Sequence, residues 1–189
     1  RVICADIFKL AENTNALVEL IPELDLVSCR PLVFIGCAPC QGFSAHRKKD
    51  HRDDPRNSLM VAFAKICMKF KPDVLVMENV PEILGGRYSQ YYDIAAKIIS
   101  DGGYKLTQSV LDLSRFGIPQ RRKRAIVIGS RKARIDLPLP VFDVEHALTV
   151  RHAISHLTPI EAGRVDEYDP YHKAPDHTER ILERIRKTP

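Results

Sequence analysis

The residues with the clearest capacity for chemistry stand in the loop 36–44, which follows the apolar segment 31–35. That segment is too short for a typical helix and is rich in β-branched and aromatic residues, which predicts a buried strand. A thiol on the loop after such a strand lies at the carboxyl end of the strand, where open α/β sheets bind their ligands. Pro39 fixes one backbone dihedral angle just before Cys40, so a stiffened backbone presents the Cys40 thiol.

The two cysteines of this loop, Cys37 and Cys40, allow three interpretations. The first is a tight turn with two buried cysteines. The second is a redox or metal-binding pair, because the two residues have Cys-x-x-Cys spacing. In the third, Cys40 is a single nucleophile and Cys37 is a packing residue. The loop alone does not decide between them.

A carboxyl group, Glu78, follows the second apolar segment, 73–77, which also predicts a buried strand. Parallel strands end at the same edge of a sheet, so the Cys40 thiol and the Glu78 carboxyl can face one pocket. A buried Glu is rare unless it is paired or functional. The simpler alternative is an exposed residue at a strand end or a helix cap.

Positive charge is concentrated in residues 115–134, which contain eight Lys or Arg and no Asp or Glu. A patch of one sign suits a polyanion such as nucleic acid, although a solvated surface is the usual alternative. Part of this run leads into the last predicted strand. Alternation along that strand predicts Arg122 and Arg124 on one side, with Arg121 and Lys123 on the other.

The whole chain has 189 residues, of which 44% are hydrophobic and 28% charged, with a net charge of +5. These values predict one soluble globular domain, with an appendage at most. No apolar run reaches membrane length, and the first residues do not form a signal peptide. Five cysteines in a chain of this length do not form a secreted disulfide framework, so we expect a reducing, intracellular setting.

Strands alternate with helices along the chain, which predicts an α/β fold with a mostly parallel sheet flanked by helices. The expected strands are the end of one at 1–4, followed by 32–36, 73–77, 104–113 and 124–129. The expected helices are 13–20, 59–71 with a cap at Asn57-Ser58, one through 91–98, 150–157, and 178–186 with Asp176 as N-cap and Glu179 completing a capping box. The polar segment 46–57 predicts a mobile lid. After Pro138 the composition shifts toward Pro, His and charge.

Five short motifs, in this order, resemble the C5-cytosine DNA methyltransferase family. They are Ala5-Asp6-Ile7, Pro39-Cys40-Gln41, Asp54-Pro55-Arg56-Asn57-Ser58-Leu59, Glu78-Asn79-Val80 and Gln120-Arg121-Arg122-Lys123-Arg124. The resemblance implies a Rossmann-like, S-adenosylmethionine-dependent methyltransferase fold that lacks its first strands here. Residues 1–137 would be a partial catalytic domain, and 138–189 the start of a target-recognition region.

The resemblance also implies a mechanism. The Cys40 thiolate adds to C6 of cytosine, which makes C5 nucleophilic enough to accept a methyl group. A protonated Glu78 donates to N3, Arg124 binds O2, and Arg122 supports the same loop. Because C5 is inaccessible inside a duplex, the cytosine must be flipped out.

The ligands implied by the resemblance are S-adenosylmethionine and double-stranded DNA, with the enzyme acting as a monomer on DNA and without metal or membrane. The implied cofactor-binding residues are Asp6, Ile7, Pro39 and Leu59. The implied DNA-binding residues are Gln41, Ser44, Arg121 and Lys123. The expected location is the bacterial cytoplasm, at the nucleoid, or the nucleus of a eukaryote. Whether the enzyme belongs to a restriction–modification pair is left open.

Three alternatives remain at this stage. One is a thioredoxin-like oxidoreductase that uses Cys37 and Cys40, and another is a zinc site that adds His46 and His51. The third is a DNA-binding relative that no longer catalyses. The chain begins with Arg1 and shows no glycine-rich cofactor turn before Asp6. We therefore expect residues 1–189 alone to bind the cofactor weakly or not at all, and to methylate nothing.

Overall fold

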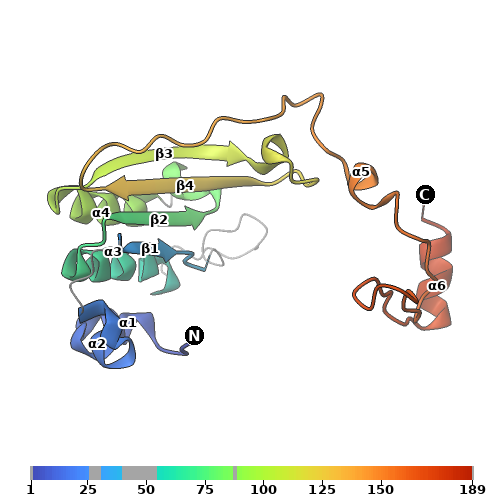
Figure 1. Ribbon diagram of the computed structural model, residues 1–189, viewed down its shortest axis with the longest axis horizontal. Helices are drawn as coiled ribbons and strands as arrows, with labels where there is room; N and C mark the ends of the chain where they lie inside the picture. Colours follow the sequence, from blue (N-terminus) through green and yellow to red (C-terminus); the bar gives the residue numbers. More distant parts are fainter. Residues whose placement is uncertain (1, 26–30, 40–54, 87–88, 189) are drawn as a thin grey trace. The chain divides into compact units, whose positions relative to one another are not determined.

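The computed structural model describes residues 2–25, 31–39, 55–86 and 89–188 (Figure 1). Its strands are β1 (Val33–Gly36), β2 (Val74–Asn79), β3 (Lys105–Asp112) and β4 (Lys123–Ser130). Its α-helices are α1 (Ile7–Glu12), α2 (Asn15–Leu20), α3 (Leu59–Phe70), α4 (Ser89–Asp101), α5 (Val150–Ile154) and α6 (Glu179–Arg186). Short 3-10 turns are η1 (Pro22–Asp25), η2 (Pro55–Ser58), η3 (Pro81–Leu84) and η5 (Leu113–Phe116).

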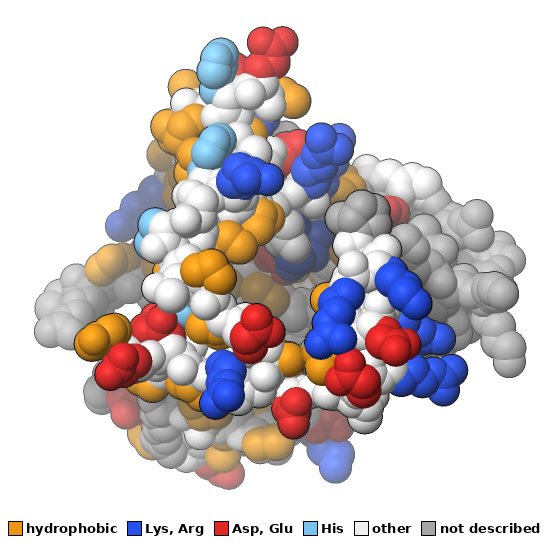
Figure 2. Space-filling view, turned by 90° about the vertical axis from the view of Figure 1, so that its right-hand side faces the viewer, with side chains coloured by type: hydrophobic (Ala, Val, Ile, Leu, Met, Phe, Trp, Pro, Cys, Tyr) orange, Lys and Arg blue, Asp and Glu red, His pale blue; other side chains and the backbone are white. Residues whose placement is uncertain are grey.

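The chain divides into two compact units, Arg1–Ala147 and Leu148–Pro189. The first contains the sheet. The second contains α5, α6 and a β-bridge between Val165 and Lys173. On the face seen in Figure 2, Lys and Arg side chains are intermixed with Asp and Glu. In the second unit, Arg186 Nη1 lies 2.8 Å from Glu179 Oε1. A target-recognition role for the residues from 138 onward stays a prediction. Among the described residues, no helix is both long enough and apolar enough to span a membrane.

The sheet has the strand order β1-β2-β4-β3. β1 and β2 are parallel, with Val33 opposite Val74 and Gly36 opposite Met77. β4 is antiparallel to both β2 and β3, so β1, β2 and β3 run in one direction and β4 runs back (Figure 1). The prediction of an α/β fold with a mostly parallel sheet is confirmed. Because β4 runs back, its first residues lie at the edge where β1 and β2 end.

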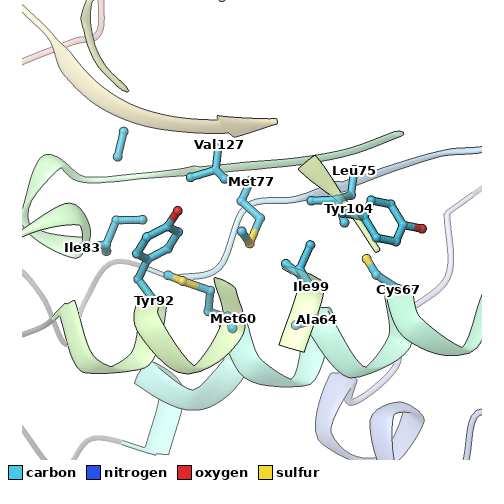
Figure 3. Packing of buried hydrophobic residues seen from close by; sticks show 12 residues of the cluster. Met60, Ala64, Cys67, Leu75, Met77, Ile83, Tyr92, Ile99, Tyr104 and Val127 are labelled. Carbon is cyan, nitrogen blue, oxygen red and sulfur yellow. The ribbon is translucent and has the colours of Figure 1, made fainter. Parts of the chain in front are cut away.

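The core lies between one face of this sheet and the helices α3 and α4. Side chains alternate along β2: Leu75 and Met77 are buried, whereas Val74 and Val76 on the other face are only partly covered. Figure 3 shows the buried side chains of both helices pointing toward the strands. The buried cluster is Met60, Ala64, Cys67, Leu75, Met77, Ile83, Tyr92, Ala95, Ile99, Tyr104, Ala125 and Val127.

Truncation of Leu75 to alanine is expected to lower the free energy of unfolding by about 2–5 kcal/mol. Leu75 is fully buried on a central strand and faces Gly129, whose missing side chain leaves room for the leucine methyl groups. Urea denaturation of the intact protein measures the change. Leu139→Ala is the control, because Leu139 is 85% exposed and its loss should change stability by less than about 0.5 kcal/mol. Equal shifts for the two variants would contradict this account of the core.

The expected end of a strand at residues 1–4 is wrong, since residues 2–4 form no strand. The helix α1, which was not predicted, follows them and begins beside a residue with an expected role in the site. The Asp6 carboxylate is its N-cap and accepts a 2.8 Å hydrogen bond from the Phe8 N–H. The segment 13–20 is helical only in α2, where Thr14 makes no side-chain capping bond. A helix of six residues such as α1 is too short to show a clear periodic pattern in the sequence.

Ser58 is the N-cap of α3, as predicted, although its side chain makes no capping bond, whereas the predicted cap of α6 is wrong. Ser58 precedes α3, but its hydroxyl donates to the Pro55 carbonyl at 2.6 Å, because residues 55–58 already form the turn η2. At α6 the N-cap is Thr178 rather than Asp176, whose carboxylate accepts from the His177 N–H instead. Short polar side chains bond whichever backbone group the local turn offers, so the cap position follows the turn.

Candidate active site

A cavity of about 260 Å³ opens at the carboxyl edge of β1 and β2. Its walls come from the ends of these strands and from the first turns of α1 and α3. Gly36 at the end of β1 permits this arrangement, since a Cβ there would lie 2.8 Å from the Phe63 ring of α3. Glu78, at the end of β2, lines the same cavity. The cavity therefore lies where the sequence predicted a ligand site.

Glu78 and Arg124 form an ion pair at this cavity. Arg124 Nε lies 2.7 Å from Glu78 Oε1, and the two side chains are 18% and 33% exposed, respectively. The strand register explains the contact. Glu78 is opposite Ile126 across β2 and β4, and Arg124, two residues before Ile126, lies on the same face. The sheet thus brings together two of the predicted catalytic residues.

The electrostatic state of this pair follows from its geometry. The Arg124 guanidinium lies 2.7 Å from the Glu78 carboxylate, so the two side chains attract each other directly. Arg124 also donates from Nη1 to the Lys123 carbonyl oxygen at 2.8 Å, which holds the guanidinium in place over the strand end. Much of each side chain is shielded from water, so screening weakens the pair less than it would weaken an exposed pair.

The loop that leads to the predicted nucleophile is described as far as Pro39, and both Cys37 and Pro39 line the cavity. Cys40, Gln41 and Ser44 lie outside the described residues, as does most of the predicted lid 46–57. The Cys37 thiol is exposed, so the interpretation of Cys37 as a packing residue is wrong.

Asn79, next to Glu78, holds this loop. Its Nδ2 donates to the Ala38 carbonyl oxygen at 3.1 Å, and its Oδ1 accepts from the Val80 N–H at 2.8 Å. Asn79 is only 3% exposed. In the sequence, Asn79 stands out only as part of the motif Glu78-Asn79-Val80. Its position at the end of a buried strand was the available signal, because a buried amide there must find hydrogen-bond partners nearby.

The predicted cofactor residues lie at the cavity or next to it in sequence. Ile7, Pro39 and Leu59 line it, and Asp6 precedes Ile7 at the start of α1. Further apolar residues line the cavity and were not predicted: Ile35, Ala38, Met60, Phe63 and Met77. Apolar walls with a carboxylate beside them fit a flat purine ring that carries an exocyclic amine, which is the chemistry of the adenine end of S-adenosylmethionine.

Comparison with known proteins identifies the family to which this chain belongs. The sequence model of the C-5 cytosine-specific DNA methylases matches residues 3–184. The chain belongs to this family. It is 38% identical to the type II methyltransferase M.DdeI of Desulfomicrobium norvegicum over 93% of the chain and 45% of that protein. It is 31% identical to DNA (cytosine-5)-methyltransferase 1 of Gallus gallus over 69% of the chain and 9% of that protein.

A solved structure agrees with the match. The crystal structure of a prophage-encoded candidate DNA modification methyltransferase of E. coli superimposes with a TM-score of 0.63 at 27% identity. The superposition covers 85% of this chain and 43% of the E. coli chain. The methylase-family chain therefore spans less than half the length of these relatives. Membership of this family also sets aside the thioredoxin-like alternative.

The basic residues of the methylase-family chain do not form one surface. Arg121, Arg122 and Lys123 are exposed where β4 begins, whereas Arg131 and Lys132 follow its last residue. An eight-residue strand separates the two groups by about 24 Å. At the far end, Lys132 lies 3.7 Å from the Asp73 carboxylate. The prediction of a single patch over 115–134 is wrong, because adjacency in sequence hides the length of the strand between the groups.

Arg122 does not share the position of Arg124. It lies before the first residue of β4, and its carbonyl oxygen accepts from the Leu113 N–H at 2.8 Å. Its side chain is exposed and makes no ion pair with any residue in the described part of the chain. Arg122 therefore lies beside the site without joining the Glu78–Arg124 pair.

Two further questions about the described residues concern the buried thiol of Cys67 and the possibility of a metal site. Burial raises the pKa of the Cys67 thiol to about 12, so Cys67 stays a neutral core residue. Over the described ranges, no three His, Cys, Asp or Glu residues are grouped so that they could hold a metal ion. The zinc-site alternative involves Cys40, His46 and His51, which lie outside those ranges.

Proposed function

We propose that this protein transfers a methyl group from S-adenosylmethionine to C5 of a flipped-out cytosine in double-stranded DNA, through a covalent adduct with Cys40. The observation that carries the proposal is the Glu78–Arg124 pair at the cavity reached by the Cys40 loop. A carboxyl and a guanidinium side by side can bind the N3, exocyclic amine and O2 edge of a cytosine. Cys40 would then face the C5–C6 bond.

The chemistry divides into three steps for the chain's own residues. The Cys40 thiolate forms a bond to C6, and the electron pair of the C5–C6 double bond moves toward C5. When bound, S-adenosylmethionine would supply an electrophilic methyl group to C5, its methyl–sulfur bond breaking so that the neutral thioether leaves. A base then removes the C5 proton, the double bond re-forms and the Cys40 sulfur leaves as a thiolate.

In this scheme Glu78 and Arg124 exchange their contact with each other for contacts with the cytosine. In the free site each neutralises the other. When cytosine enters, the Arg124 guanidinium donates to O2, and Glu78 loses part of its cationic partner. A protonated Glu78 would donate to N3, where negative charge develops during thiolate addition.

The remaining contacts follow from the positions of the side chains. Ile7, Pro39 and Leu59 would pack on the cofactor, and Asp6 would accept from its adenine amine. Arg121 and Lys123 are exposed beside the cavity and can reach DNA phosphates. Gln41 and Ser44, next to Cys40 in sequence, would contact the flipped base or its backbone. The enzyme would act as a monomer, since one chain supplies these groups.

The biological role that we propose is modification of a specific DNA sequence. The relatives M.DdeI of Desulfomicrobium norvegicum and M.HgiDI of Herpetosiphon aurantiacus are named type II methyltransferases, and the latter is 37% identical over 79% of this chain. Their names support a partnership with a restriction enzyme for this protein as well.

The test is methyl transfer by the intact protein as encoded. Unmethylated bacterial DNA, which contains every short target sequence, is incubated with S-adenosylmethionine that carries a tritiated methyl group. We expect label in the DNA and, after digestion to nucleosides, 5-methylcytosine as its only carrier. The matched control is the same DNA after a first, unlabelled round of methylation, which should accept no further label. Label on the cytosine or adenine amine would contradict the proposed reaction.

A further inference from the structure

Asn79 joins the three pieces of chain that carry the proposed catalytic groups. Its side chain donates to Ala38, two residues before Cys40, and accepts from the N–H of Val80. Its backbone continues from Glu78. In the sheet it is paired with Ala125, the neighbour of Arg124.

The orientation of the Asn79 amide is fixed by its partners. A carbonyl oxygen can only accept, and a backbone N–H can only donate, so Nδ2 must face Ala38 and Oδ1 must face Val80. Asn79 is 97% buried, which leaves water little access to either bond. Neither bond can be exchanged for one to solvent without opening the core face of the sheet, where Ala125 and Val127 pack.

The hydrogen bonds between β1 and β2 do not extend to residues 37–39, which lead to Cys40. β1 ends at Gly36, which is opposite Met77, so residues 37–39 have already left the sheet. The Asn79 side chain reaches past the end of the ladder to Ala38. This hydrogen bond therefore fixes the position of residues 37–39 relative to the end of β2, which bears Glu78.

We propose that Asn79 is a positioning residue, which fixes the loop bearing the Cys40 thiol relative to the Glu78–Arg124 pair. The inference rests on the proposed function, because it concerns the distance between the attacking sulfur and the base held by that pair. Asn79 lines the cavity from the core face of β2, opposite Glu78, but the polar atoms of its side chain are both bonded to backbone groups of the chain itself. Its effect on the reaction passes through the loop.

Two variants of the intact protein test the hydrogen bonds that the Asn79 side chain makes to Ala38 and Val80. Asn79→Asp keeps the acceptor for the Val80 N–H but replaces the donor to Ala38 by an oxygen, which repels the carbonyl. Asn79→Ser adds no charge and is too short to reach Ala38. For both we expect covalent adduct formation with duplex DNA containing 5-fluorocytosine to slow about a hundredfold at saturating DNA and cofactor. Affinities for both ligands should stay at wild-type values.

The matched control is Tyr104→Phe. The Tyr104 hydroxyl is buried and donates to the Pro72 carbonyl at the opposite edge of the sheet, so this change also removes one buried hydrogen bond. We expect it to lower the Tm as much as Asn79→Ser does, with adduct formation at the wild-type rate. A lowered rate in the Asn79 variants alone would then report position rather than general stability.

The outcomes are distinct. Wild-type adduct rates in both Asn79 variants would overturn the inference, as would an equal loss of rate in Tyr104→Phe. If Asn79→Asp fails to fold, Asn79→Ser decides alone. A wild-type protein that forms no adduct with 5-fluorocytosine DNA would overturn the proposed function itself, and the positioning role with it.

Discussion

Replacement of Cys40 by alanine is expected to abolish methyl transfer while DNA binding persists. The reaction needs a nucleophile at C6, because C5 of cytosine is otherwise too poor a nucleophile to take the methyl group. Alanine removes the sulfur and adds no bulk. The readout is a protein–DNA adduct that survives denaturation, formed on duplex DNA with 5-fluorocytosine at the target site, where the fluorine blocks the final elimination.

The control for Cys40 is provided by the same loop. Cys37 is exposed and lines the same cavity, so it is the competing thiol. Cys37→Ala should form the adduct, and the cross-linked peptide of the wild-type protein should contain the modification on Cys40. A cross-link on Cys37, or an adduct that persists in Cys40→Ala, would show that the nucleophile is wrongly assigned.

Separate and joint changes of Glu78 and Arg124 should each cost the enzyme most of its turnover. Glu78→Gln keeps the shape of the side chain but removes the proton donor to N3, which typically costs about a hundredfold or more. Arg124→Ala removes the donor to O2, and losses for such a donor are about 100- to 1000-fold. Single-turnover rates with labelled cofactor measure both effects, while filter binding reports DNA affinity.

The double variant tests whether the two groups act as a unit. Because Arg124 Nε lies 2.7 Å from Glu78 Oε1, the loss in the double variant should fall well short of the product of the single losses. Lys123→Ala is the matched control: Lys123 is exposed at the start of β4, so its removal should mainly weaken DNA binding and its salt dependence. Small and equal losses for all three residues would remove the pair from the chemistry.

The strands and the edge that carries the site could be predicted from sequence because their signals are local. The segments that became β1 and β2 are short apolar runs, and each is followed at once by a chemically active residue. Two such strands with helices between them run parallel, so the loop after β1 and Glu78 were expected at one edge. That expectation needed no knowledge of packing.

The pairing of Glu78 with Arg124 could not be predicted in the same way. It depends on the direction and register of β4, and these are set by contacts between residues far apart in sequence. The same holds for the basic run, which β4 divides between two edges. Asn79 also escaped notice as an individual residue, because its partner at Ala38 is 41 positions away. Local signals place elements, whereas long-range register decides which side chains meet.

The direction of β4 limits the sequence positions from which a cation can reach Glu78. Only every second residue of a strand points to the face that holds Glu78. A guanidinium moved by one position, to residue 123 or 125, would point to the core face instead. Moved by two positions, it would lie about 6.8 Å away along the strand. A cation that pairs with Glu78 from β4 is therefore tied to position 124, because a shift of one or two positions along the strand breaks the pair.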